Sequence, residues 1–291
     1  MIRAADAITA LRERLADASP SAALDAELLV AHVLGIGRAA LAADPGRALA
    51  PEERSALESF ARRRLAGEPV AYLTGRREFW SLDLEVTPDV LVPRPETELL
   101  VERVLAAIAG IARPVVLDLG TGSGAIALAI ASMRPDAAVT ATDRSAAALA
   151  VAQRNAARLG FANVRFIQGD WFLPLAGARF DAIVSNPPYV AAGDPALAAL
   201  AYEPRLALVA DADGLAALSA VVAGACAHLV PGGRLVLEHG AGQGAAVREL
   251  LRVSGFADVE TRRDLAGHER ASEGTWPREA VESAPPTERT R

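Results

Sequence analysis

The chain has 291 residues, of which 52% are hydrophobic and 23% are charged, a composition typical of a folded globular protein rather than a disordered one. Its 30 basic and 36 acidic residues give a formal net charge of −6, so it lacks the basic excess with which many proteins bind nucleic acid through phosphates. Cys226 is its single cysteine, which excludes an intrachain disulfide and a zinc site built from several cysteines.

Residues 1–75 are predicted to form a small all-helical N-terminal domain. Apolar side chains recur at three- and four-residue spacing between Leu11 and Val33, which is the pattern of a helix with one buried face. Pro51 is followed by two glutamates, and this order favours a helix start, because proline fits the first turn and carboxylates stabilise it. We find no alternation typical of a strand before Pro69.

Residues 76–95 are predicted to form a β-hairpin linker between this domain and the rest of the chain. Apolar and polar side chains alternate from Glu78 to Val86, as they do in a strand with one buried face. A further helix is expected to begin near Pro95 and to run to about Ile111.

From Pro114 onward, short apolar runs alternate with helical patterns, which is typical of a parallel sheet covered by helices on both faces. Strands are expected at 115–119, 138–142, 164–167, 182–185 and 234–238. Helices are expected at 124–133, 146–159, 214–229 and 243–253. We therefore predict an α/β domain over 96–273, with 258–264 and 269–273 as an antiparallel edge. The composition of 274–291 predicts a disordered tail.

The first segment with a chemical signature follows the predicted strand at 115–119. Its glycine-rich turn, Gly120-Thr121-Gly122-Ser123-Gly124, leads into a helix, so main-chain N–H groups at a helix N-terminus can meet a ligand there. The spacing differs from the G-x-G-x-x-G of dinucleotide-binding proteins, although the loop alone does not separate S-adenosylmethionine from NAD. The alternative is a tight strand-to-helix turn without a ligand.

Polar residues also follow the next two predicted strands. Asp143 lies where a carboxylate can accept both hydroxyls of a ribose, although it could equally cap the following helix. Asp170 and Trp171 follow the third strand, where an acceptor and a flat indole can hold the amino group and the ring of adenine. A lone tryptophan more often belongs to the core, but polar residues at three successive strand ends favour a ligand site.

The segment Asn186-Pro187-Pro188-Tyr189 follows the fourth predicted strand. A planar amide or aromatic amine is a weak nucleophile because its lone pair is delocalised, so an enzyme that methylates it needs acceptors for both N–H groups. The Asn186 side-chain oxygen and the Pro187 main-chain oxygen can accept them, while the prolines stiffen the turn and Tyr189 can stack on the substrate. We expect Asn186, Pro187 and Tyr189 to be catalytic, all four residues to bind substrate, and Asn186 also to contact the cofactor.

Five segments together resemble the HemK/PrmC family of peptide chain release factor glutamine methyltransferases: Gly75–Trp80, Pro93–Glu98, Asp170–Phe172, Asn186–Tyr189 and Leu237–Gly240. The resemblance extends over about 11–273, and its motifs fall in the family's order. It implies a helical N-terminal domain that recognises the release factor, a hairpin linker and a class I, Rossmann-like methyltransferase domain. It also implies S-adenosylmethionine as methyl donor, S-adenosylhomocysteine as product, no metal, and the glutamine of the release factor's Gly-Gly-Gln motif as acceptor.

Carried over to this sequence, the family's cofactor site falls on Gly120–Gly124, Asp143 and Trp171, and its substrate clamp falls on Asn186–Tyr189. We expect a cytoplasmic monomer that modulates translation termination and binds neither DNA nor a membrane. Two alternatives methylate other planar nitrogens, namely an adenine-specific nucleic acid methyltransferase and a ribosomal-protein glutamine methyltransferase. A third alternative is a protein that binds S-adenosylmethionine or a dinucleotide without catalysis.

Overall fold

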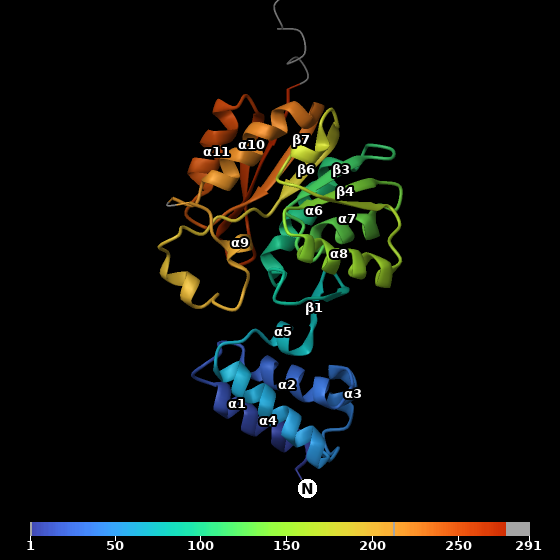
Figure 1. Ribbon diagram of the computed structural model, residues 1–291, viewed down its shortest axis with the longest axis vertical. Coiled ribbons are helices and arrows are strands. Elements are labelled where there is room, and N and C mark those ends of the chain that lie inside the picture. The colour runs from blue at the N-terminus through green and yellow to red at the C-terminus, as the bar shows by residue number, and fades with distance from the viewer. Residues whose placement is uncertain (1, 212, 278–291) are drawn as a thin grey trace, which may run out of the picture. The chain divides into compact units, whose positions relative to one another are not determined.

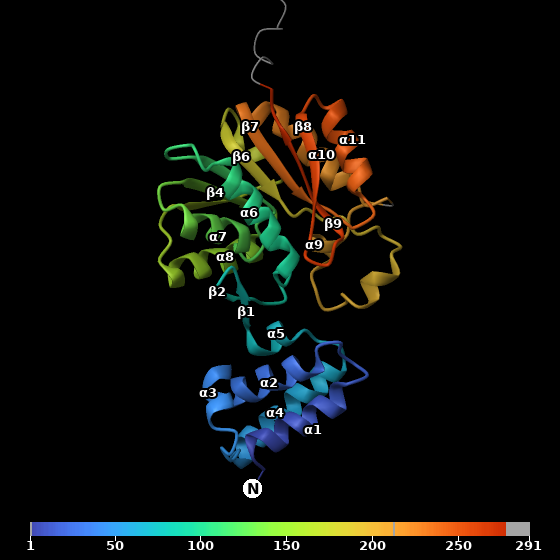
Figure 2. The same cartoon turned by 180° about the vertical axis from the view of Figure 1, so that it is seen from behind.

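The computed structural model describes residues 2–211 and 213–277. The chain forms two compact units, drawn in Figure 1 and Figure 2. One unit comprises the residues up to Arg76 together with Val86–Pro88, and the other comprises Arg77–Glu85 and the residues from Asp89 onward. In the described part of the chain, no helix is long and apolar enough to cross a membrane.

The first unit is helical, as the apolar spacing of its sequence predicts. Its helices are α1 (Ala4–Leu15), α2 (Ala22–Val33), α3 (Arg38–Ala43), α4 (Pro51–Leu65) and α5 (Val70–Thr74). Leu11 and Leu15 of α1 pack in one buried cluster with Leu29 of α2, Ala61 of α4 and Leu73 of α5. These positions recur at helical spacing, so each helix presents one apolar stripe to a shared core.

The second unit contains a seven-stranded, mostly parallel sheet. Its strands are β3 (Val115–Leu119), β4 (Ala138–Asp143), β5 (Val164–Gln168), β6 (Phe180–Ser185), β7 (Leu229–Glu238), β8 (Ala257–Arg263) and β9 (Glu269–Thr275). They lie in the order β5-β4-β3-β6-β7-β9-β8, with β9 antiparallel to both of its neighbours. The chain therefore moves outward from β3 to β5 and then returns to build β6 on the other side of β3.

Helices cover both faces of this sheet, as Figure 1 and Figure 2 show. One face packs against α6 (Glu98–Ala107), α7 (Ala125–Met133) and α8 (Ala146–Leu159), and the other against α10 (Ala216–His228) and α11 (Gly244–Val253). Val116 and Val184 lie in the first buried cluster, whereas Leu117 and Ile183 lie in the second. This alternation along each strand explains why the predicted strands read as continuous apolar runs.

Three further short helices are η1 (Pro95–Thr97), η2 (Leu173–Leu175) and η3 (Pro195–Ala198), and a single α-helical turn forms α9 (Arg205–Leu208). The predicted strands and helices of the sheet domain are confirmed, with differences at their ends. The helix expected to reach Ile111 ends at Ala107, because residues 108–113 turn toward β3. The expected tail overlaps β9, in which Gly274 and Thr275 pair with Leu235 and Arg234 of β7. The rest of that tail, from residue 278, lies outside the described residues.

The predicted hairpin consists of β1 (Arg76–Phe79) and β2 (Leu82–Glu85). Phe79 and Leu84 are buried in the same cluster as α6 and α7, so the hairpin packs onto the sheet unit. The Asn155 side chain of α8 accepts a hydrogen bond from the Glu85 N–H (2.7 Å) and donates one to the Glu85 carbonyl (2.9 Å). A buried amide therefore satisfies an edge of this short ribbon, which is marginal in isolation.

Asp118 holds the junction between β3 and α7. It is fully buried, and its Oδ2 accepts hydrogen bonds from the Thr121 hydroxyl (2.6 Å) and the Ala127 N–H (3.2 Å). Its Oδ1 has no hydrogen-bond partner among the described residues. Burial away from water raises the pKa of the Asp118 carboxyl to about 7, because it disfavours the charged form.

This raised pKa predicts a measurable pH dependence of stability. The folded chain binds the Asp118 proton more tightly than the unfolded chain, so this group lowers stability as pH rises from about 4 through about 7. In Asp118→Asn, the amide oxygen can replace Oδ2 and the side chain cannot ionise. We expect the fall in Tm between mildly acidic and mildly basic buffer to shrink by about 2–4 °C in this variant. Thermal unfolding followed by circular dichroism measures it, and an unchanged pH dependence would contradict the role given to Asp118.

Candidate active site

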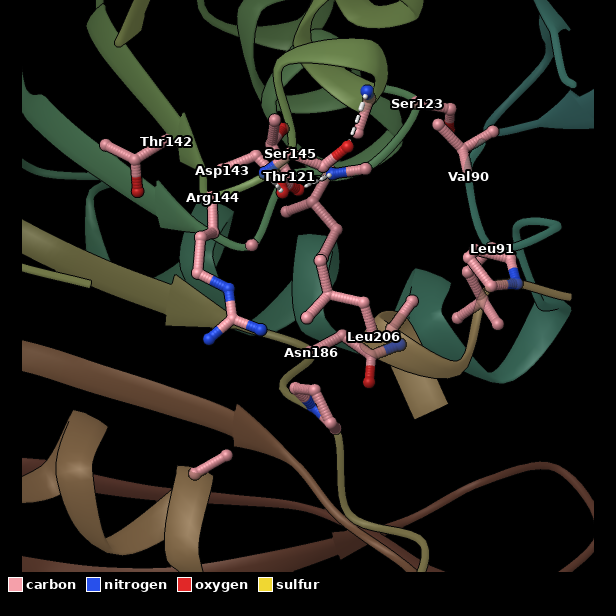
Figure 3. A pocket seen from close by; sticks show the side chains of 18 of the residues that line it. Val90, Leu91, Thr121, Ser123, Thr142, Asp143, Arg144, Ser145, Asn186 and Leu206 are labelled. Carbon is pink, nitrogen blue, oxygen red and sulfur yellow. Dashed lines mark hydrogen bonds between the residues drawn. The ribbon is translucent and has the colours of Figure 1, made fainter. Parts of the chain in front are cut away.

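A cavity of about 380 Å³ opens at the carboxyl ends of β3, β4, β5 and β6. Ligands of open α/β sheets bind where the strand order reverses, and here that point lies between β3 and β6. The volume falls in the range of about 300–1,000 Å³ that is usual for small-molecule sites. In Figure 3, Val90 and Leu91 lie across this pocket from Thr142 and Arg144.

The glycine-rich loop after β3 forms one wall of the pocket. Gly120 has a φ of +72° and Gly124 a φ of +85°, which side chains other than glycine rarely adopt. A Cβ on Gly124 would also lie 3.1 Å from Leu128 and 3.2 Å from Ala152. Gly124 therefore permits α7 and α8 to pack closely, and it does not line the pocket. Gly120 does line the pocket, and it contributes no side-chain atoms there.

Asp143 ends β4 and binds this loop. Its Oδ2 accepts a hydrogen bond from the Gly122 N–H (2.9 Å), and its Oδ1 accepts one from the Ser145 N–H (2.8 Å). The alternative in which Asp143 caps the following helix is wrong, because the Ser145 hydroxyl oxygen accepts the hydrogen bond from the Ala148 N–H at the start of α8. Burial raises the pKa of the Asp143 carboxyl. The carboxylate lines the pocket and keeps acceptor capacity for a ligand there, since its two oxygens together offer about four lone pairs.

Asp170 and Trp171 follow β5 and line the same pocket. The indole of Trp171 also packs against the buried cluster of β3, β6 and α10, so Trp171 contacts the core and lines the pocket at the same time. Its φ is +44°, which is uncommon outside glycine and costs of the order of 1 kcal/mol. Strained backbone conformations are common at functional sites, so this conformation at the pocket wall favours a functional role for Trp171.

The Asn186–Tyr189 segment follows β6. The Ser185 hydroxyl donates to the Leu119 carbonyl (2.7 Å) and thereby fixes the end of β6 against the end of β3. The amide nitrogen of Asn186 donates to the Thr97 hydroxyl oxygen (3.3 Å). The Tyr189 hydroxyl donates to Glu238 (3.1 Å), and burial raises the pKa of that hydroxyl above its ordinary value.

The structure brings most of the predicted site residues into one pocket. Those that line it are Gly120, Thr121, Gly122, Ser123, Asp143, Asp170, Trp171, Asn186 and Pro188. Three others flank the pocket without lining it: Gly124, Pro187 and Tyr189. The ligand contacts of all these residues stay predictions. Among the described residues, no group of three or more His, Cys, Asp or Glu side chains is placed to hold a metal ion.

A second wall of the pocket was not predicted from the sequence. It is formed by side chains from two segments, 89–94 and 204–210, and Figure 3 labels Val90, Leu91 and Leu206 among them. The buried carboxylate of Glu203 joins them, because it accepts a hydrogen bond from the Val92 N–H (3.0 Å) and pairs with the Arg94 guanidinium. The sequence offers the Pro93–Glu98 motif and the Tyr202-Glu203-Pro204 segment as separate signals, and neither indicates that Glu203 pairs with Arg94.

The chain is similar to known proteins in both of its parts. Residues 6–75 match the family described as the PrmC N-terminal domain, and residues 113–270 match the one described as a methyltransferase domain. The release factor glutamine methyltransferase of Burkholderia pseudomallei (strain K96243) is 56% identical over 268 residues, covering 89% of this chain and 94% of that protein. The protein of the same name from Escherichia coli (strain K12) is 47% identical over 271 residues, covering 91% and 97%.

Among solved structures, the T. thermophilus 16S rRNA N2 G1207 methyltransferase in complex with AdoMet and guanosine is similar over 69% of this chain and 49% of that chain. Its TM-score is 0.53 and its sequence identity is 23%, so this likeness bears on the fold alone.

Proposed function

Because this chain belongs to the release factor glutamine methyltransferase family, we propose that it methylates the side-chain amide nitrogen of the glutamine in the Gly-Gly-Gln motif of peptide chain release factors. S-adenosylmethionine is the proposed donor and S-adenosylhomocysteine the product, with no metal required. The observation that carries the proposal is that Asn186 shares one pocket with the glycine-rich loop and Asp143. The protein would act as a cytoplasmic monomer that modulates translation termination without binding DNA.

The residues of the pocket fit an adenosyl ligand. Gly120 lines the pocket with main-chain atoms alone, and its φ of +72° is one that other residues rarely adopt. Asp143 offers carboxylate lone pairs to ribose hydroxyls, and Asp170 offers an acceptor to an adenine amino group. The Trp171 indole offers a flat apolar surface to the base.

The chain's own contribution to the reaction is to hold the acceptor nitrogen in line with the methyl group. S-adenosylmethionine supplies a methyl group made electrophilic by its sulfonium. The Asn186 side-chain oxygen and the Pro187 carbonyl accept the two N–H groups of the substrate amide, so that its nitrogen can pyramidalise. As the nitrogen takes up the methyl group it becomes acidic and releases one proton to solvent water, so a strong base is not required. Catalysis then rests mainly on positioning.

The cofactor assignment predicts selective stabilisation. S-adenosylmethionine or S-adenosylhomocysteine should raise Tm, because a ligand that binds only the folded state stabilises it, whereas NAD should not. Asp143→Ala should weaken S-adenosylhomocysteine binding by about tenfold or more, since a charge-assisted hydrogen bond contributes about 1.5–3 kcal/mol. Isothermal titration calorimetry measures the affinity. Equal stabilisation by NAD would contradict the assignment.

The clamp assignment predicts that Asn186 acts on the rate rather than on cofactor affinity. Removal of one hydrogen bond made in the transition state typically costs about 100-fold in rate. We therefore expect Asn186→Ala to slow single-turnover methylation of a release factor by at least that factor, while S-adenosylhomocysteine affinity changes little. Rapid quenching with labelled S-adenosylmethionine measures the rate. A variant that turns over at the wild-type rate would exclude Asn186 from the clamp.

The N-terminal helical unit is proposed to recognise the release factor. A fragment that begins at Arg77 should retain S-adenosylhomocysteine affinity, because the described residues lining the pocket all lie in the second unit. Its rate of methylation of intact release factor should nevertheless fall by about tenfold or more. A few anchor residues carry most of the energy of an interface, and the fragment would lack those of the helical unit. Calorimetry establishes that the fragment is folded, and a methylation assay follows. Full activity on intact release factor would show that the unit is dispensable.

A further inference from the structure

A chain of hydrogen bonds lies behind the Asn186 amide. Glu238, at the carboxyl end of β7, is 1% exposed. Its Oε2 accepts a hydrogen bond from the Thr97 hydroxyl (2.7 Å), and its Oε1 accepts one from the Tyr189 hydroxyl (3.1 Å). Thr97, at the end of η1, is 4% exposed and also accepts the hydrogen bond from the Asn186 amide nitrogen (3.3 Å). Three segments that are distant in sequence thus meet behind one side chain.

The number of protons on each group determines which group donates and which accepts in this series of hydrogen bonds. A hydroxyl carries one proton, and that of Thr97 points to Glu238, whose ionised form accepts hydrogen bonds and cannot donate. The Thr97 oxygen can therefore only accept from its other neighbour, so Asn186 must present its NH₂ group to Thr97. The Asn186 side-chain oxygen is then directed away from Thr97 and remains available to a ligand in the pocket that Asn186 lines.

We propose that Thr97 and Glu238 are positioning residues that fix the orientation of the Asn186 amide, so that its oxygen rather than its nitrogen meets the substrate. This inference rests on the proposed function, in which the substrate amide donates to Asn186. An asparagine amide can turn by 180° at little cost when both of its ends face solvent or equivalent partners. The turned amide would present N–H groups to the N–H groups of glutamine and would not bind it. The Thr97–Glu238 pair therefore selects a hydrogen-bond donor over an acceptor in the substrate.

The matched variants are Thr97→Val, which keeps the branched shape and removes the hydroxyl, and Thr97→Ser, which keeps the hydroxyl. We expect Thr97→Val to slow single-turnover methylation by about tenfold or more, less than the roughly 100-fold cost of a hydrogen bond made directly in the transition state, because Thr97 acts through Asn186. Thr97→Ser should recover most of that rate. S-adenosylhomocysteine affinity should be alike in all three proteins. Thr140→Val, the same chemical change on β4, is the control for a general loss of stability.

A second readout separates orientation from mere packing. Release factors with Gly-Gly-Gln and with Gly-Gly-Glu present a donor and an acceptor, respectively, to Asn186. The wild type should bind the glutamine form more tightly, and Thr97→Val should reduce this ratio of Kd values by about threefold or more, since its Asn186 can turn to donate. Thr97→Ser should keep the ratio. Thr97→Ala serves in place of Thr97→Val if the latter does not fold, with the same expected loss of preference.

The outcomes are distinguishable. Failure of the wild type to methylate the glutamine form would overturn the proposed function itself. Wild-type methylation together with an unchanged rate and an unchanged ratio in Thr97→Val would overturn the positioning role alone. A slower rate with an unchanged ratio would also overturn it, because Thr97 would then act through packing rather than through the orientation of Asn186.

Discussion

The reversal of strand order between β3 and β6 governs the arrangement of the whole site. Leu119 at the end of β3 is in register with Thr142 of β4 and with Ser185 of β6, so the loops that follow these strands begin at the same level of the sheet. The Ser185 hydroxyl, bonded to the Leu119 carbonyl, keeps the ends of β3 and β6 together. The glycine-rich loop and Asn186 consequently line one pocket, in which a methyl donor and an acceptor can meet.

Three carboxylates around this space, of which Asp118 and Glu238 are buried and Asp143 is half-buried, accept hydrogen bonds from neutral N–H and O–H groups. Asp118 holds the start of α7, Asp143 holds the glycine-rich loop, and Glu238 holds Thr97 and Tyr189. Burial raises the pKa of all three carboxyl groups. Short hydrogen bonds from N–H and O–H groups are directional, so these acids fix loop geometry where an exposed ion pair would leave freedom.

Much of the sheet domain was predictable because its signals are local. Continuous apolar runs identify β3 to β6, and the residue types after them identify the pocket-lining positions such as Asp143 and Asn186. The extension of β9 through Gly274 was missed, because glycine weakens a strand locally while its pairing with Leu235 of β7 is a tertiary feature. The Glu203–Arg94 pair was missed for a related reason. A buried acid and a surface acid look alike in a sequence, and these residues are 109 positions apart.

The stacking role expected of Tyr189 stays a prediction, and its hydroxyl has a partner that the sequence did not indicate. An aromatic residue beside a clamp suggests a stacking surface, but only the fold reveals that its hydroxyl binds the buried Glu238 from β7.

The central claim, that this pocket methylates a glutamine amide, is tested most directly by the product. Wild-type protein and labelled S-adenosylmethionine are incubated with release factor and DNA in one mixture, and tandem mass spectrometry and nucleoside analysis locate the label. The account predicts one methyl group on the amide nitrogen of the Gly-Gly-Gln glutamine, and label on adenine or on any other residue of the release factor would contradict it.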